Sequence, residues 1–248
     1  RDYVMGEVLR VDWFDLADEN READWAWMHS AFLPALKAAQ GVAWVGHYDI
    51  IAHPPRPYIE GAPAKQETTD PAIATGWQNV VLSSGLSTDS FLGPDNEVDA
   101  LYAANADRLG AWHNHRVCVF VEEKVVNGPE ERAMPYGAGP PPAMQIGSFN
   151  ADTTAHNEML ARWYRAERFP RIAVSRGIIR GRKMLSLTGW AKHGVLWEGT
   201  ELGPDDYSFE PRFIEADRNE EWSGPHVLEY VTHAPGSPHA GRRVWPKV

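Results

Sequence analysis

Apolar and polar residues along the chain form short alternating runs and longer runs with helical spacing. Tyr3–Trp13 has strand character. From Glu19 to Ala39, apolar residues are spaced for one face of a helix, and Pro34 within this stretch predicts a bend or break. Gly41 then serves as a helix stop, and Val42–Ile51 is predicted to be the second strand.

Strand-like and helix-like runs also follow one another in the rest of the sequence. After a proline-rich stretch it predicts a strand, a helix and a strand at Trp77–Ser83, Asn96–Trp112 and His115–Val125. The second half repeats the order strand, helix, strand, strand, helix, strand. Its predicted elements are Met144–Phe149, Thr153–Val174, Ile178–Leu187, Trp190–Glu198, Asp205–Arg218 and His226–Thr232.

Residue spacing supports an internal repeat. The residues Trp27, Pro34 and Gly41 recur, as the same three types, 136 positions later. The triplet Thr75-Gly76-Trp77 recurs with an offset of 113, which places an insertion of 23 residues, 53–75, in the first copy. Several blocks that recur in the same order indicate a duplicated unit.

These patterns predict an α+β fold made of two tandem ferredoxin-like βαββαβ repeats. The first repeat covers 1–126, a Pro/Gly-rich linker 127–142, the second repeat 143–235 and a C-terminal tail 236–248. Helices on one face of each antiparallel sheet leave the other face apolar and exposed. We therefore expect the two sheets to face each other as an intramolecular α+β barrel, with a ligand pocket at its mouth.

The segment Leu160–Ile172, followed by Gly177, resembles the first helix of the dimeric α+β barrel superfamily, which includes EthD-like, Dabb-type and antibiotic-monooxygenase-like domains. In that group the helix typically reads W-Y-x-x-x-H-x-P. Arg168 and Phe32 occupy the histidine position in the two copies, so the role of that histidine cannot be carried over. Members include cofactor-free oxygenases, cyclases and isomerases, haem-binding enzymes and stress proteins. The resemblance therefore implies a pocket and leaves the reaction open.

Four residues are candidates for catalysis. His47 and Asp49 lie two apart on a predicted strand and so share a face, where a carboxylate can raise the basicity of an imidazole; a hydrogen-bonded pair at a strand edge is the alternative. His193 lies mid-strand, where it is either a catalytic base or a satisfied core histidine. His115 begins a strand two residues after His113, but no third ligand at a suitable spacing predicts a metal site.

Aromatic residues predict the walls of a substrate pocket, with core packing as the alternative. The insertion could form a lid over one barrel mouth and contact the ligand. The predicted substrate-binding residues are Trp77, Trp190, Trp44, Trp197, Tyr58 and Arg56.

Charge and composition exclude several classes of partner. The net charge is −10, with 24 basic against 34 acidic residues, and the short basic run Arg180–Lys183 is expected to be solvated surface. Nucleic acid and anionic membranes are therefore not expected partners. Cys118 is the single cysteine and is expected to be buried. We expect a cytoplasmic protein, monomeric or homodimeric.

The leading hypothesis is an enzyme without a cofactor that acts on a hydrophobic, aromatic small molecule by histidine-mediated proton transfer. Isomerase, cyclase, lyase and monooxygenase chemistry all remain open. One alternative is a non-catalytic ligand-binding or stress-related protein. The other is a haem protein, since a single axial histidine leaves no sequence signature.

Overall fold

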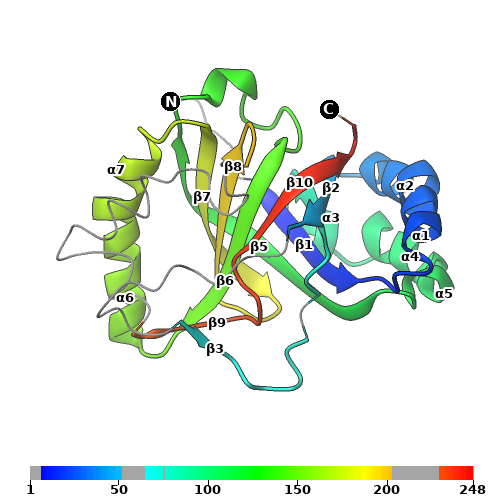
Figure 1. The fold of residues 1–248 in the computed structure, drawn as a ribbon, viewed down its shortest axis with the longest axis horizontal. Helices are drawn as coiled ribbons and strands as arrows, with labels where there is room; N and C mark the ends of the chain where they lie inside the picture. Colours follow the sequence, from blue (N-terminus) through cyan, green and yellow to red (C-terminus); the bar gives the residue numbers. More distant parts are fainter. Residues whose placement is uncertain (1–6, 52–64, 75, 203–228, 248) are drawn as a thin grey trace.

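The computed structural model describes residues 7–51, 65–74, 76–202 and 229–247. Its centre is a closed antiparallel barrel of 8 strands, with helices on the outside (Figure 1). Around the barrel the strands follow the order β10, β2, β4, β1, β5, β7, β8 and β6, and β6 pairs with β10 to close the ring. Their bounds are β1 Val8–Asp15, β2 Val42–Ile50, β4 Asn79–Gly85, β5 His113–Asn127, β6 Ala143–Ala151, β7 Ile178–Thr188, β8 His193–Gly199 and β10 His239–Trp245.

The barrel has two joints between the halves of the chain. One is the antiparallel pair β5–β7, and the other is the pair β10–β2. Within the halves the strands lie in the orders β2-β4-β1-β5 and β7-β8-β6-β10, which is the same arrangement relative to the sequence. Outside the barrel, β3 (Gln66–Glu67) pairs in parallel with β9 (Val231–His233).

The last barrel strand was predicted at the wrong place. Only the end of the predicted strand His226–Thr232 coincides with β9, and the barrel is completed by β10, within the predicted tail 236–248. A strand with Arg242 and Arg243 in its middle does not stand out as apolar in the sequence, yet its backbone pairs with both β2 and β6. The predicted helix Asp205–Arg218 lies outside the described residues.

The first helical stretch of each half passes through a π-helical turn. In the first half α1 (Arg21–Trp27) and α2 (Leu33–Ala38) flank η1 (Met28–Phe32); in the second, α6 (Thr154–Trp163) and α7 (Phe169–Ile172) flank η3 (Tyr164–Arg168). A proline follows each π turn by two residues, and the wider turn lets the helix continue where the proline supplies no N–H. Among the residues that the structure describes, the other helices are α3 Asp89–Leu92, α4 Glu97–Ala104, α5 Ala106–Leu109 and the 3₁₀ turn η2 Glu131–Ala133. Within the described residues, no helix has the length and apolar character to span a membrane.

Side chains fill the interior of the barrel. They come from strands of both halves, so each half hides the apolar sheet face of the other. Separate apolar clusters lie between each half of the barrel and its helices. The interior cluster consists of Leu9, Val11, Trp13, Trp44, Tyr48, Val80, Leu82, Cys118, Phe120, Met144, Ile146, Met184 and Leu196.

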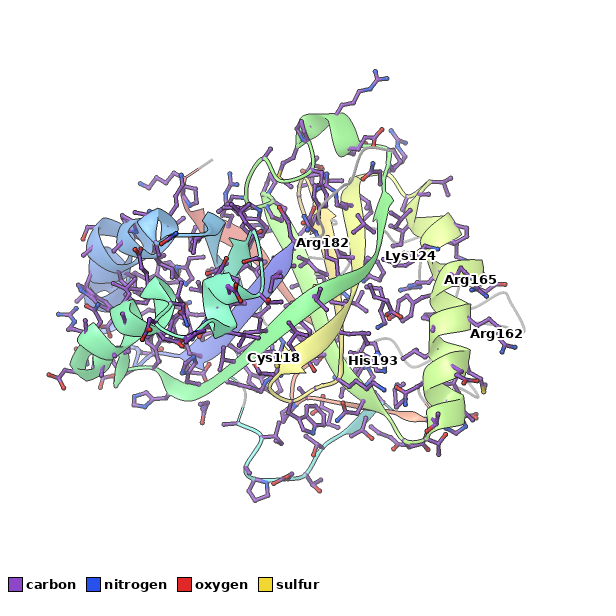
Figure 2. The ribbon with its side chains drawn as sticks, turned by 180° about the vertical axis from the view of Figure 1, so that it is seen from behind. Cys118, Lys124, Arg162, Arg165, Arg182 and His193 are labelled. Atoms are coloured by element: carbon purple, nitrogen blue, oxygen red, sulfur yellow. The ribbon has the colours of Figure 1, made fainter. Side chains whose placement is uncertain are left out.

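A charged cluster, which we define as Glu7, Glu122, Arg182 and Glu198, lies buried inside the barrel. Its arginine, Arg182, is labelled in Figure 2. The Arg182 guanidinium contacts Glu7 at 2.5 Å through Nη1 and Glu198 at 2.7 Å through Nε, and it also contacts Glu122. The nearby Arg180 binds the other Glu198 oxygen at 2.8 Å. The run Arg180–Lys183 is therefore buried, and the expectation that it is solvated surface was wrong.

Candidate functional site

His47 on β2 points toward the helices rather than into the barrel. Its Nδ1 lies 2.8 Å from Nε2 of His29, in the π turn, and its Nε2 lies 3.0 Å from Oδ1 of Asn79. The predicted partner Asp49 instead accepts a hydrogen bond of 2.6 Å from Arg21 on α1. The expected His47–Asp49 pair does not form, because helix α1 and its π turn supply nearer partners for both.

Burial keeps the His47 ring neutral. Desolvation, helped by the positive potential of His29, lowers the pKa of His47 to about 3 although Asn79 acts in the opposite direction. Trp25 packs edge-on against the ring at a centroid distance of 5.1 Å. His47 is thus part of the polar and aromatic packing of the first half.

His193 on β8 faces the helical layer of the second half (Figure 2). Its Nδ1 lies 2.9 Å from Nζ of Lys183, and its Nε2 lies 2.5 Å from Oδ1 of Asn157 on α6. Phe149 stacks on the ring at 5.7 Å. Burial, followed by the charges of Lys183 and Lys192, lowers the pKa of His193 to about 3.

Lys183 is the polar residue that the sequence analysis missed. Its amine is buried and also binds Glu123 at 3.0 Å and the carbonyl of Met184 at 3.1 Å. Burial lowers the pKa of Lys183, while Glu123 acts in the opposite direction. Strand alternation could have revealed it, since Lys183 and Leu185 share the helix-facing side of β7, where they lie opposite Val195 and His193 of the paired strand β8.

His115 lies at a third place, apart from the other two histidines. Its Nε2 contacts Oδ1 of the fully buried Asp12 at 2.8 Å. Burial raises the pKa of Asp12, but Arg10 and His115 outweigh this effect and lower it to about 2. The three histidines predicted to be catalytic therefore occupy three separate hydrogen-bonded sites.

The predicted substrate-binding residues do not gather in one pocket. Trp197 packs in the helix-facing core of the second half, and Trp77 is 56% exposed. The carbonyl of Trp190 accepts hydrogen bonds from Arg116 and from the thiol of Cys118. Trp44 faces the barrel interior and lines a cavity. Tyr58 and Arg56 lie outside the described residues.

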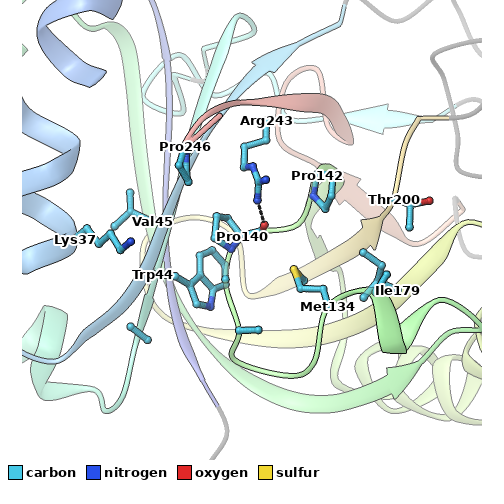
Figure 3. Close-up of a pocket in the computed structure, with 14 residues that line it drawn as sticks. Lys37, Trp44, Val45, Met134, Pro140, Pro142, Ile179, Thr200, Arg243 and Pro246 are labelled. Carbon is cyan, nitrogen blue, oxygen red and sulfur yellow. Dashed lines mark hydrogen bonds between the residues drawn. The ribbon is translucent and has the colours of Figure 1, made fainter. Parts of the chain in front are cut away.

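The cavity next to Trp44, which we call the barrel-end cavity, has a volume of about 460 Å³ (Figure 3). Strand β2 forms one wall, and the segment between β5 and β6 forms another with Met134 and Pro140. Trp44 is held in place because its Nε1 donates a hydrogen bond of 3.2 Å to Glu7. The lining residues are Lys37, Ala43, Trp44, Val45, Ala133, Met134, Ala138, Gly139, Pro140, Pro142, Ile179, Thr200, Arg243 and Pro246.

Comparison with known proteins shows the fold. No family model and no curated protein matches the chain. Similar solved structures include "Putative Chlorite dismutase TA0507" (TM-score 0.55, 12% identity, covering 97% of this chain and 96% of that one) and an anthrone oxidase-like protein (0.52, 9%, 98% and 92%). A dye-decolorizing protein from V. cholerae is also similar (0.50, 11%, 97% and 94%).

The comparison contradicts the expectation that this protein uses no cofactor. Chlorite dismutases and dye-decolorizing proteins bind haem, so a cofactor-free protein cannot stand as the main expectation for this fold.

The barrel-end cavity does not fit a haem site, because its described lining holds no histidine, cysteine or tyrosine that could bind the iron. His47 and His193 also offer no free ring nitrogen, since both nitrogens of each are hydrogen-bonded. Nε2 of His115 contacts Asp12. In the part of the chain that the structure describes, no three His, Cys, Asp or Glu side chains group as metal ligands.

Proposed function

We propose that this chain is an enzyme of the oxidative, small-molecule type whose substrate is a compact hydrophobic molecule bound in the barrel-end cavity. The observation that carries the proposal is the cavity itself. Its volume of about 460 Å³ falls in the range of ordinary ligand sites, and its lining is mainly apolar. The oxidative chemistry is supported by the anthrone oxidase-like and dye-decolorizing proteins that share the fold.

The cavity walls differ in rigidity. Trp44 offers a flat surface fixed by its hydrogen bond to Glu7. In the segment that leads from β5 to β6, Pro140 and Pro142 restrict the backbone, whereas the unbranched Met134 side chain adapts to a ligand's outline. Such a site suits a planar ring system better than a flexible chain.

Filling the cavity tests the proposal. Ala138 is exposed and lines the cavity, so Ala138→Trp should occupy it without disturbing the core. We expect the wild-type protein to bind the neutral fluorophore N-phenyl-1-naphthylamine saturably and Ala138→Trp to lose most of this binding. Ala104→Trp, on an exposed face of α4 outside the cavity, serves as the matched control.

The outcome decides the location of the site. Equal binding by wild type and Ala138→Trp, or no binding by either, would reject the cavity as the substrate site. Oxygen consumption with anthrone-type and phenolic compounds then tests the oxidative assignment, and Ala138→Trp should lower any turnover found.

A second candidate function is proton transfer at His193. The contact between Lys183 and His193, buried beneath α6, favours it because neighbouring amine and imidazole groups can exchange a proton. Purified His193→Gln should then fold normally but lose any turnover that the wild type shows with the anthrone-type and phenolic compounds. His47→Gln should retain that turnover. Unchanged rates in His193→Gln would remove this candidate.

We further propose that the two halves are copies of one ferredoxin-like unit, related to the dimeric α+β barrel superfamily. The identical strand order supports this, as does the π turn before Pro34 and before Pro170. Gly41 and Gly177, separated by the same offset, both have positive φ, at 81° and 84°. Residues 1–126 and 143–248 expressed as separate chains should associate with each other, which size-exclusion chromatography would measure.

A further inference from the structure

Two cations line the barrel-end cavity without a carboxylate. Lys37 is exposed at its edge, and Arg243 projects into it from β10 (Figure 3). No aspartate or glutamate is among the lining residues, and within the described residues neither cation forms an ion pair. In a chain of net charge −10, this is a local excess of positive charge.

The Arg243 guanidinium has an N–H group that donates no hydrogen bond within the described residues. One terminal nitrogen donates to the carbonyl of Pro140, which holds the segment between β5 and β6 against β10. Its Nε is buried and has no hydrogen-bond partner. A buried guanidinium N–H without an acceptor is costly, so an oxygen that reached it would be bound favourably.

The position of these charges relative to Trp44 defines a ligand shape. The indole and the prolines form an apolar wall, and the guanidinium and ammonium groups lie at the same cavity. A carboxylate or sulfonate can accept two hydrogen bonds from a guanidinium, which adds orientation to the charge attraction.

We propose that the barrel-end cavity selects an amphipathic anion: an aromatic body against Trp44, with a carboxylate or sulfonate bound by Arg243 and attracted by Lys37. This inference rests on the proposed function, since it names the substrate class of the same cavity. The inference goes beyond the proposed function because a neutral aromatic molecule would fill the cavity but would leave its two cations without an anionic partner.

Two fluorophores that share a ring system test the charge preference directly. 1-Anilinonaphthalene-8-sulfonate carries an anion, and N-phenyl-1-naphthylamine is its neutral counterpart. We expect wild type to bind the sulfonate about tenfold more tightly than the neutral probe, as one charge-assisted hydrogen-bonded contact predicts. Arg243→Gln should abolish the preference, Lys37→Gln should reduce it severalfold, and Arg243→Lys should retain part of it.

Arg132→Gln is the matched control. Arg132 is an exposed cation on η2, next to the lining residue Ala133 but outside the cavity lining, so its loss should leave the preference unchanged. Circular dichroism of each variant checks that the loss of the Arg243–Pro140 contact has not unfolded the protein.

The outcomes separate the two proposals. Equal affinity of wild type for both probes, with both displaced in Ala138→Trp, overturns the anion preference and keeps the cavity as the site. Absence of binding by either probe overturns both proposals. A preference that survives Arg243→Gln and Lys37→Gln, or that falls equally in Arg132→Gln, assigns it to general surface charge and overturns the inference.

Discussion

The arginine of the charged cluster inside the barrel and the arginine at the barrel-end cavity differ in their binding partners. Arg182 meets the carboxylates of Glu7, Glu122 and Glu198, while Arg243 meets only a backbone carbonyl. The regions are adjacent, since Glu7 also accepts the hydrogen bond from Trp44, which lines the cavity. A cation whose partners come from the chain contributes to a defined fold, and one without them remains available to a ligand.

Removing the paired arginine should produce the largest effect. Arg182→Met leaves the carboxylates of Glu7 and Glu122 buried without a cationic partner, whereas Glu198 keeps its contact with Arg180. Breaking buried ion pairs in this way costs roughly 3–5 kcal/mol. Urea unfolding followed by circular dichroism should show this loss. A loss below about 1 kcal/mol would mean that the cluster is not what fixes this end of the barrel.

The dependence of stability on pH should test whether burial keeps His47 neutral. The pKa of His47 is lowered to about 3 in the folded protein. Between about pH 6.5 and 3, His47 is therefore protonated in the unfolded chain but neutral in the folded protein. Stability should therefore fall as pH drops below about 6.5, by about 3 kcal/mol from His47 alone at pH 4. His47→Gln should make this dependence less steep, and His193, whose pKa is lowered in the same way, accounts for part of what remains. An identical pH profile in the variant would contradict the shift.

Tyr48→Phe should have an intermediate effect. The Tyr48 hydroxyl, inside the barrel, donates a hydrogen bond of 2.8 Å to the carbonyl of Pro141. Its loss leaves a carbonyl without that donor, which costs about 1–2 kcal/mol in thermal or urea unfolding. No change at all would indicate that the segment between β5 and β6 docks on the barrel without this contact.

Arg243→Met should change the free energy of unfolding least, by about 1 kcal/mol or less. The Pro140 carbonyl loses a donor, but the buried Nε without a partner is removed as well and no carboxylate of the described residues loses a counter-ion. Compared with Arg182→Met in the same urea titration, it isolates the effect of ion pairing. A loss as large as that of Arg182→Met would place Arg243 among the structural arginines and oppose a ligand-binding role.

The sequence predicted the barrel because its apolar patterns are local. Strands β1, β2, β4, β5, β6, β7 and β8 overlap their predicted ranges, and the facing of two apolar sheets follows from burial alone. The strand β10 was missed because Arg242, Arg243 and nearby prolines mask its pattern. Its pairing depends on open edges that two distant strands present.

The candidate site was harder to predict because its contacts are not local. Alternation correctly separates His47 from Tyr48, but it cannot reveal that a helical turn brings His29 to the ring. The run Arg180–Lys183 resembles a solvated face until Glu7 and Glu122, distant in sequence, are placed beside it. Trp44 lines a cavity, as expected for a predicted substrate-binding residue. Arg243, which lines the same cavity, could not be predicted because nothing in the sequence marks it as a pocket residue.

The pairing of β10 with β2 also has a consequence for synthesis on the ribosome. Strand β2 emerges almost 200 residues before β10, so its free edge stays unpaired while all the chain between them is made. A nascent chain of this architecture is therefore exposed to strand-to-strand aggregation until β10 emerges. Chaperone dependence during expression is the expected consequence of closing a barrel with two strands so far apart in the sequence.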